Sequence, residues 1–232
     1  MEPHMDNDLH RELIDAARVL AQAGLVDAFG HVSVRTSPTS ALLTPPRPLG
    51  SLGAGDSPLA LTTDSNELPA GAPKEAWLHL AVMERDSNVG AVCRAQPRAV
   101  AAIAALGRVP AALNGHAAML GPVALHPDSQ LVRNRDAAEA IAESVGSAQA
   151  VVLRGNGAVT WGRDIAEAVA RMWILERSAE LDLRASAAGS PIELPTVEQE
   201  WWRERASELL PRLYRFLETL LQDQHRPSLG DE

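Results

Sequence analysis

Hydrophobic and polar positions follow two rhythms along the chain. Between residues 9 and 23 the apolar positions recur every three or four residues, which predicts an amphipathic helix that ends at Gly24. Proline and capping residues introduce further predicted helices over 73–85, 97–106, 137–145 and 164–184. Short apolar or alternating runs predict strands over 28–35, 41–44, 59–62, 89–96, 123–125, 150–153 and 158–161.

These elements alternate without an internal repeat, so we predict one α/β domain with a central sheet over residues 8–187. A disordered leader is expected over 1–7, a helical extension over 188–222 and a disordered tail over 223–232. In the extension, Thr196 and Gln199 have the spacing of a capping box. An apolar stripe then favours packing on its own domain, with a subunit contact as the alternative: Ala206, Leu210, Leu213, Leu217 and Leu220.

Composition narrows the class of protein. The chain has 232 residues, of which 46% are hydrophobic and 22% charged, as in an ordinary globular protein. The net charge of -9 argues against nucleic-acid binding, and no apolar run is long enough to cross a bilayer. The N-terminus is acidic and polar rather than a secretory signal, and the single Cys93 cannot form an internal disulfide. We therefore expect a cytoplasmic protein.

Polar side chains occur at several strand and helix ends. The alternating segment from Gly30 to Arg35 can line a cleft with His31 and Ser33, although taken alone it favours a half-exposed strand. Glu75 and His79 share one helix face. Glu75 can serve as a base, a metal ligand or, most commonly, a partner of the helix dipole, whereas a histidine such as His79 is more often part of a core.

Arg94 and Gln96 lie two residues apart on a predicted buried strand, so their side chains point to the same face. A buried arginine requires an anionic partner, either Glu75 or a carboxylate of a substrate. Asn156 lies in the segment Arg154-Gly155-Asn156-Gly157, whose composition is that of a hairpin turn. An ordinary turn and a functional loop are equally compatible with that composition.

Taken in order, four segments resemble the class II aldolase/adducin family over roughly residues 9–186. They are Gly24-Leu25-Val26 with Gly30–Arg35, then Pro73–His79, Val89–Gln96 and Leu153–Gly162. The resemblance implies a three-layer αβα domain with a mainly antiparallel, mixed sheet. It also implies a homo-oligomer, by family habit a tetramer, with active sites between subunits.

In metal-using members of this family, three histidines bind a divalent ion beside a glutamate. By position, those histidines are replaced here by Arg94, Gln96 and Asn156, and only Glu75 is retained. Arginine cannot ligate a cation and repels it, and amide oxygens bind zinc poorly. We therefore expect no metal and no other cofactor. The three histidines His31, His79 and His116 have no spacing that requires an alternative site.

The family's phosphate-anchoring positions also differ. They read Thr44-Pro45-Pro46-Arg47 and Pro73-Lys74, and proline lacks the N–H that would cradle a phosphate. Lys74 and Arg47 remain able to bind an anion as point charges. The Gly30-His31 pair and the form of residues 153–157 are closer to decarboxylase-type members, which act on small oxo or aromatic acids.

These observations predict a metal-independent lyase that decarboxylates, cleaves or forms a carbon–carbon bond in a small anionic or ketonic substrate, with a role in specialised metabolism. Glu75 is the expected acid/base, Arg94, Gln96 and Asn156 stabilise an oxyanion, and His31 or His116 assists proton transfer. The alternatives are a non-catalytic, adducin-like scaffold and a cyclase or eliminating enzyme on the same fold. The residues expected to bind the substrate are Ser33, Arg35, Thr44, Lys74, His79 and His116.

Overall fold

A computed structural model describes residues 3–222. For residues 3–7 it describes the backbone only. The helices are α1 (Pro3–Gln22), α2 (Ala76–Arg85), α3 (Arg98–Ala105), α4 (Gly115–Leu120), α5 (Arg135–Ser144), α6 (Ile165–Ala188), α7 (Thr196–Glu204) and α8 (Ala206–Gln222). The strands are β1 (His31–Ser37), β2 (Ser40–Leu43), β3 (Leu59–Thr62), β4 (Ala91–Ala95), β5 (Val123–His126), β6 (Ala150–Leu153) and β7 (Ala158–Gly162). A single turn of 3-10 helix covers Leu49–Ser51.

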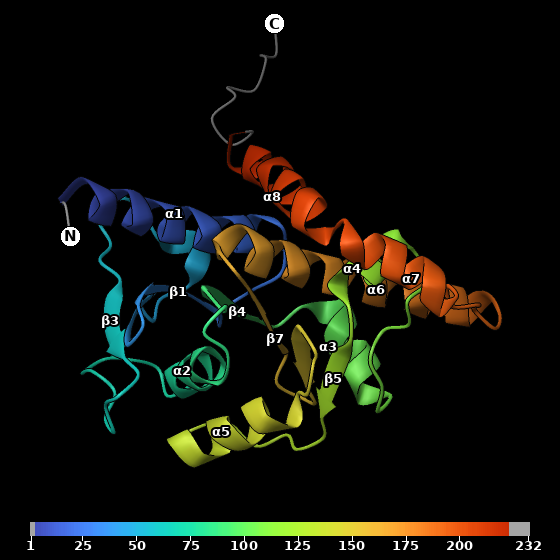
Figure 1. The fold of residues 1–232 in the computed structure, drawn as a ribbon, viewed down its shortest axis with the longest axis horizontal. Coiled ribbons are helices and arrows are strands. Elements are labelled where there is room, and N and C mark those ends of the chain that lie inside the picture. Colours follow the sequence, from blue (N-terminus) through green and yellow to red (C-terminus); the bar gives the residue numbers. More distant parts are fainter. Residues whose placement is uncertain (1–2, 223–232) are drawn as a thin grey trace, which may run out of the picture.

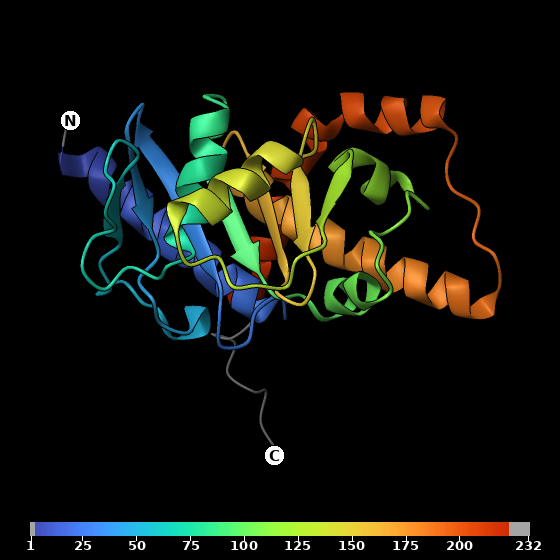
Figure 2. The same cartoon turned by 90° about the horizontal axis from the view of Figure 1, so that it is seen from below.

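The strands form one seven-stranded sheet in the order β3-β2-β1-β4-β7-β6-β5. β5 and β6 are parallel, and the other neighbouring pairs are antiparallel. Helices cover both faces of this sheet, with α1, α6 and α8 on one side and α2 and α5 on the other (Figures 1 and 2). The predicted three-layer αβα domain with a mixed, mainly antiparallel sheet is confirmed.

Two apolar clusters fill the spaces between the layers. One contains Cys93 and Ala95 of β4 and packs against α1, α3, α6 and α8. The other contains Val92 of the same strand and packs against α2 and α5. Because side chains alternate along a strand, Arg94 points to the face that carries Val92, and so toward the layer of α2.

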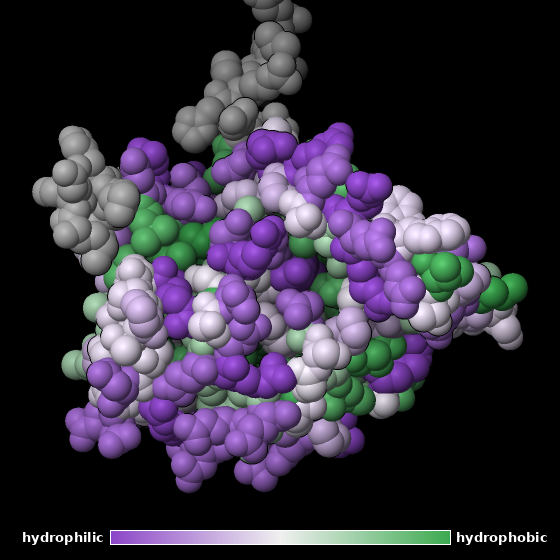
Figure 3. Space-filling view, in the orientation of Figure 1, coloured by the Kyte–Doolittle hydropathy of each residue, from purple (hydrophilic) through white to green (hydrophobic). Residues whose placement is uncertain are grey.

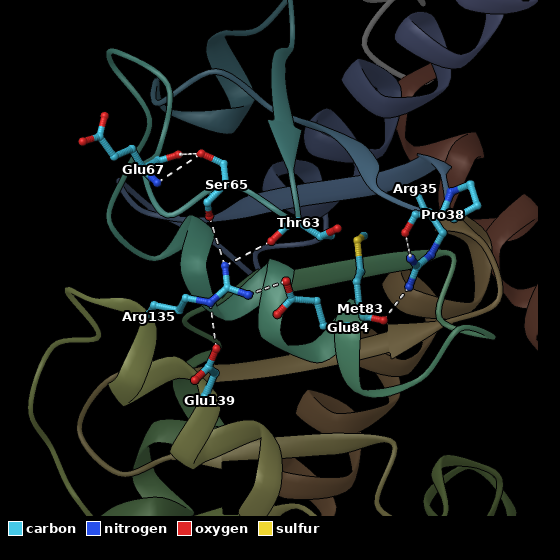
Figure 4. A network of polar contacts seen from close by, with 9 residues as sticks. All are labelled: Arg35, Pro38, Thr63, Ser65, Glu67, Met83, Glu84, Arg135 and Glu139. Carbon is cyan, nitrogen blue, oxygen red and sulfur yellow. Dashed lines mark hydrogen bonds and ion pairs between the residues drawn. The ribbon is translucent and has the colours of Figure 1, made fainter.

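α2 is held in place by its neighbours as well as by the sheet. Arg135, the first residue of α5, donates to Glu84 Oε1 of α2 at 2.6 Å and to the carbonyl oxygen of Thr63 after β3 at 3.1 Å (Figure 4). Its guanidinium also lies 5.5 Å from the ring centroid of Trp77. One side chain thereby joins three segments that are far apart in sequence.

Two helices, α1 and α2, begin elsewhere than the sequence predicts, and one helix, α4, was not predicted. α1 begins at Pro3, so residues 3–7 are helical rather than a disordered leader, since the fixed φ of proline suits a first helical turn. Residues 1–2 and the predicted tail over 223–232 lie outside the described residues. α2 begins at Ala76 rather than Pro73, because Pro73–Glu75 form a separate turn closed by the bond from Ala76 N to Pro73 O. The unpredicted α4 is short, and Asn114 caps it by accepting from Ala117 N at 2.9 Å.

The C-terminal helical segment also differs. It is divided at Arg205 into α7 and α8. The predicted capping box is wrong, because Pro195 is the N-cap of α7 and makes no side-chain cap bond. Gln199 instead donates to the carbonyl oxygen of Leu194 at 2.7 Å. The apolar stripe of α8 packs within the domain, where Leu210 and Leu217 are fully buried.

Hydrophilic residues cover most of the face drawn in Figure 3, and apolar residues gather at its right-hand end, where α6 leads into α7. Ile192 in this connection is 90% exposed. Within residues 3–222, no helix has the length and apolar character needed to span a membrane.

Candidate functional site

Three segments of the chain bring the predicted chemistry together at one end of β4. His31 opens β1 and lies directly opposite Arg94 in the antiparallel pair of β1 and β4. The turn between β6 and β7 carries Asn156 to the same place, and Glu75 is the N-cap residue of α2. The site is therefore built from strand ends and a helix start on the face of the sheet that α2 covers.

A single amide oxygen links the three residues at the positions of the family's histidines. Arg94 Nη2 donates to Asn156 Oδ1 at 2.7 Å, and Gln96 Nε2 donates to the same oxygen at 3.4 Å. Arg94 and Asn156 are 2% and 5% exposed. With its oxygen occupied by both donors, the Asn156 amide has its NH2 group left to donate elsewhere.

The turn that carries Asn156 depends on glycine. Gly157 has φ of +80°, and a Cβ at this position would lie 2.2 Å from the carbonyl oxygen of Ala95. Any larger residue would therefore push the turn away from the end of β4. The glycine holds Asn156 within reach of Arg94.

Several buried polar atoms at this site have no hydrogen-bond partner among the described residues. They are Arg94 Nε and Nη1, Asn156 Nδ2, His31 Nδ1 and His79 Nε2. Those of Arg94 and Asn156 are donors, and leaving buried donors unpaired is costly. No ion pair in the described part of the chain joins Arg94 to a carboxylate, so the buried ion pair with Glu75 considered from the sequence is not formed. Burial lowers the pKa of Arg94, and the nearby charge of Glu75 opposes that shift.

Two buried histidines border the arginine. The Ser33 hydroxyl and His79 Nδ1 share a hydrogen bond of 2.7 Å, and the rings of His31 and His79 meet edge to face with centroids 6.1 Å apart. Burial, reinforced by the charge of Arg94, lowers the pKa of His31 to about 3. Burial, followed by the effects of His31 and Arg94, also lowers the pKa of His79 well below its ordinary value. Both rings are therefore neutral at neutral pH.

A cavity of about 490 Å³ opens beside this cluster. Glu75 and His31 both line it, together with Phe29 and Arg47, whereas Arg94 and Asn156 are buried and do not line it. Arg47 forms an ion pair with Asp56, and Phe29 is 65% exposed. The sequence pattern places Phe29 in a strand and does not identify it as a site residue. Its position directly before the Gly30-His31 pair is the feature that could have indicated a role in the site.

Other predicted substrate contacts lie elsewhere. Arg35 is four residues along β1 from His31. It donates to the carbonyl oxygen of Met83 at 2.6 Å (Figure 4). It also donates to the carbonyl oxygen of Val89 at 2.8 Å. Arg35 therefore fastens β1 to the end of α2. Because a strand rises about 3.3 Å per residue, Arg35 lies too far along β1 from His31 to face the cavity.

Five more predicted residues have different environments. The fully buried Thr44 hydroxyl accepts the backbone N–H of Val32 at 3.1 Å. His116 is exposed on α4 and packs edge to face on Trp173 of α6, across the sheet from the site. Lys74 is exposed in the turn before Glu75 and does not line the cavity. Ser33 and His79 are too deeply buried to line it, and they instead hold one another beside His31.

The residues at this site do not fit a divalent metal ion. Across residues 3–222, no group of three or more histidine, cysteine, aspartate or glutamate side chains is arranged to hold one. The positions where the family has ligands present a fixed cation and two amides. A guanidinium repels a metal ion, and an amide oxygen already bound to that guanidinium is a weak ligand.

The family follows from comparison with known proteins. Residues 11–183 match the family described as the Class II Aldolase and Adducin N-terminal domain, and the chain belongs to it. A Terrabacter protein named 3,4-dihydroxyphthalate decarboxylase is 34% identical over 210 residues, covering 80% of this chain and 85% of that protein. A protein of the same name from Arthrobacter keyseri is 33% identical over 196 residues, covering 77% and 79% of the two chains.

Solved structures share the fold. L-fuculose 1-phosphate aldolase from Glaciozyma antarctica superposes with a TM-score of 0.79 at 21% identity, covering 96% of this chain and 93% of its own. YgbL from Escherichia coli, described as a putative aldolase/epimerase/decarboxylase, superposes with a TM-score of 0.73 at 21% identity, covering 86% and 99%.

Proposed function

We propose that this chain is a metal-independent lyase that removes carbon dioxide from a small oxo or aromatic acid. The observation that carries the proposal is the buried Arg94, whose free donors lie beside those of Asn156 without a carboxylate partner. An anionic substrate would supply the missing acceptors. The two relatives named decarboxylases favour this reaction over aldol cleavage.

In the proposed reaction, the bond between the carboxylate carbon and its neighbouring carbon breaks, and carbon dioxide leaves. The electron pair of that bond moves onto a conjugated oxygen of the substrate, which becomes an enolate-like oxyanion. Arg94 and the amide NH2 of Asn156 donate to this oxygen, a role for which preorganised donors in a dry site are well suited. Glu75, which lines the cavity, then delivers one proton to the carbon and regains it from water.

The same residues support independence from metal ions. The family's metal stabilises negative charge on oxygen, and here a permanent cation with adjacent amide donors occupies those positions. Loss of one oxyanion-hole donor costs about 3 kcal/mol of transition-state stabilisation in enzymes where it has been measured. A cation supported by amides therefore has the magnitude needed to take over part of the metal's role.

The substrate is proposed to lack a phosphate group. Pro46 and Pro73 line the cavity where family aldolases anchor phosphate, and neither has an N–H to donate. Arg47, also in the cavity, is already paired with Asp56. A carboxylate that reaches the buried donors fits this lining better than a sugar phosphate does.

A homo-oligomer in the cytoplasm is the proposed working form. Val197 and Trp201 on α7 are 52% and 60% exposed, and Ile192 just before that helix is 90% exposed. Neighbouring exposed apolar side chains of this size are typical of protein contact surfaces. Light scattering of the purified protein measures the number of subunits.

The test measures carbon dioxide release from 3,4-dihydroxyphthalate and from a panel of oxo and aromatic acids. Purified protein is assayed before and after chelation, and its metal content is determined by elemental analysis. We expect turnover without stoichiometric metal, and a loss of at least a hundredfold in kcat/KM for Arg94→Met. Arg98→Met is the matched control, because Arg98 follows β4 but lies exposed on α3.

Two results would contradict the proposal separately. Turnover that requires a stoichiometric divalent ion would overturn metal independence while leaving the lyase assignment intact. The second result is a folded protein that binds none of the acids and whose melting temperature they do not raise, in wild type or in Arg94→Met. That result would overturn the enzyme assignment and support the scaffold alternative.

A further inference from the structure

A second polar cavity, of about 390 Å³, lies at the opposite end of β4 from the candidate active site. Val89, directly before β4, lines this cavity, whereas Gln96 belongs to the first site. Seven residues of extended chain separate them, which corresponds to about 20 Å. The cavity is enclosed by the end of β7, the first turns of α6 and the junction of α7 with α8.

Three arginines line this cavity. Arg163, Arg171 and Arg203 face two carboxylates, those of Glu167 and Asp86. The lining therefore holds three arginines and two carboxylates, in a chain whose net charge is -9. Several arginine side chains gathered around one cavity of an acidic protein can attract small anions.

The buried carboxylate is shared between two of these arginines. Glu167 is 3% exposed, and its Oε1 accepts from Arg163 Nε at 2.8 Å and Nη2 at 2.5 Å. Its Oε2 accepts from the backbone N of Arg163 at 3.1 Å and from Arg171 Nη1 at 3.4 Å. Arg163 holds the shorter bonds to Glu167, and Arg171 Nη1 also donates to the carbonyl oxygen of Trp161 at 2.5 Å.

Arg171 and Arg203 are left with incomplete partners. The Arg171 side chain is 11% exposed, and its buried Nε has no hydrogen-bond partner in the described part of the chain. The nearest carboxylate oxygen to Arg203 is that of Glu200, at 3.8 Å and on the exposed surface of α7. Asp86, the second acidic group of the lining, is bound through Oδ1 by the backbone and side-chain amides of Asn88.

We propose that this cavity binds a small tetrahedral oxyanion of the phosphate class between Arg171 and Arg203. Guanidinium groups pair preferentially with such oxyanions, and Ser207 on α8 lines the same cavity with a hydroxyl that can donate. The volume lies within the range of small-molecule sites. The bound ion would connect α6 of the domain to the α7–α8 junction, and so stabilise the C-terminal extension.

The experiment titrates the full-length protein with inorganic phosphate by calorimetry and by thermal shift, with sodium chloride at equal ionic strength as the salt control. We expect saturable binding and a higher melting temperature with phosphate. Arg203→Ala should weaken binding at least tenfold. Arg205→Ala, an equal loss of charge two residues away at an exposed position outside the lining, should retain it.

Additional variants separate this site from the others. Ser207→Glu places a carboxylate at the cavity, and we expect it to abolish the phosphate response while raising the melting temperature without phosphate. Arg94→Met should leave the phosphate response unchanged, because Arg94 belongs to the other site. A small phosphate monoester that binds more tightly than inorganic phosphate would identify a metabolite as the ligand, and equal binding would identify phosphate itself.

Equal phosphate binding by Arg203→Ala and Arg205→Ala would overturn the proposal, as would a response that sodium chloride reproduces. If phosphate binding were lost in Arg94→Met alone, the anion would be binding at the candidate active site. If Arg203→Ala did not fold, the Ser207→Glu variant would decide the question by the same two readings.

Discussion

Arg94 is a cation whose immediate neighbours are two neutral histidines and an amide oxygen. The charge is 2% exposed and has no carboxylate within ion-pairing distance among the described residues. A protein that needed only stability would replace such a group with an apolar side chain, because an uncompensated buried charge destabilises the folded state. Retaining the arginine therefore points to an anionic ligand as its partner.

The two histidines beside Arg94 make stability depend on pH. Their pKa values are lowered in the folded protein, to about 3 for His31, so the unfolded chain binds more protons below about pH 6.5. The contribution of the neutral rings to the free energy of unfolding has its full value above that pH and decreases as the pH falls. The slope reaches at most about 1.4 kcal/mol per pH unit for each histidine.

We therefore expect the free energy of unfolding to fall between pH 6.5 and 5, and to fall less steeply in His31→Asn. Urea denaturation at several pH values measures it. His116→Asn serves as the control, since it removes an exposed histidine on the other side of the sheet. Equal slopes in wild type and His31→Asn would show that His31 takes up protons normally in the folded state.

At the scale of elements, the turn between β6 and β7 does more than connect two strands. Gly155 and Gly157 both have positive φ, of 77° and 80°, and they place Asn156 between them at the end of β4. The composition of this segment is equally compatible with an ordinary turn and with a functional loop. The close approach of Gly157 to Ala95 shows why its geometry is constrained.

Gly157→Ala tests that constraint. The added Cβ would meet the carbonyl oxygen of Ala95, so we expect a loss of about 1–3 kcal/mol in stability and weaker substrate turnover. Gly146→Ala is the comparison, because Gly146 also has positive φ but no atom within 4 Å of the added Cβ. It should lose about 1 kcal/mol and keep its activity. Identical activity in the two variants would mean that the position of Asn156 does not matter.

The local pattern predicted most elements but not every position in the site. Periodicity located the strands, and the segment order indicated that Glu75, Arg94 and Asn156 belong together. Spacing along a strand could not show that Arg35 points away to bind backbone carbonyls of α2, because that depends on a helix far along the chain. The prediction that His116 belongs to the site is wrong for the same reason, since the sheet lies between α4 and the site.

At the scale of the whole molecule, the C-terminal extension is part of the domain's core. The family match ends at residue 183, yet Leu210 and Leu217 of α8 are fully buried in the cluster that contains α1 and α6. The first and last helices thus close the same apolar layer. Sequence alone could not decide whether this helix packs on its own domain or on another subunit, because a leucine stripe is compatible with both.

Leu217→Ala should therefore destabilise the domain as a core substitution does, by about 2–5 kcal/mol. Chemical denaturation followed by circular dichroism measures the change. Phe216→Ala, at the adjacent and 55% exposed position, is expected to stay within about 0.5 kcal/mol of the wild type. A small effect at Leu217 would mean that α8 detaches without exposing the core.

Arg94 also has a consequence for how the sheet assembles. β4 lies between β1 and β7, and a slip of one residue against either neighbour would exchange its two faces. Arg94 would then turn toward the apolar layer of α1 and α6, and Cys93 and Ala95 would turn away from it. A misaligned sheet would have to bury a guanidinium among hydrocarbon side chains. The residue proposed to hold the substrate thereby also penalises misfolding, and it selects the one alignment in which the site exists.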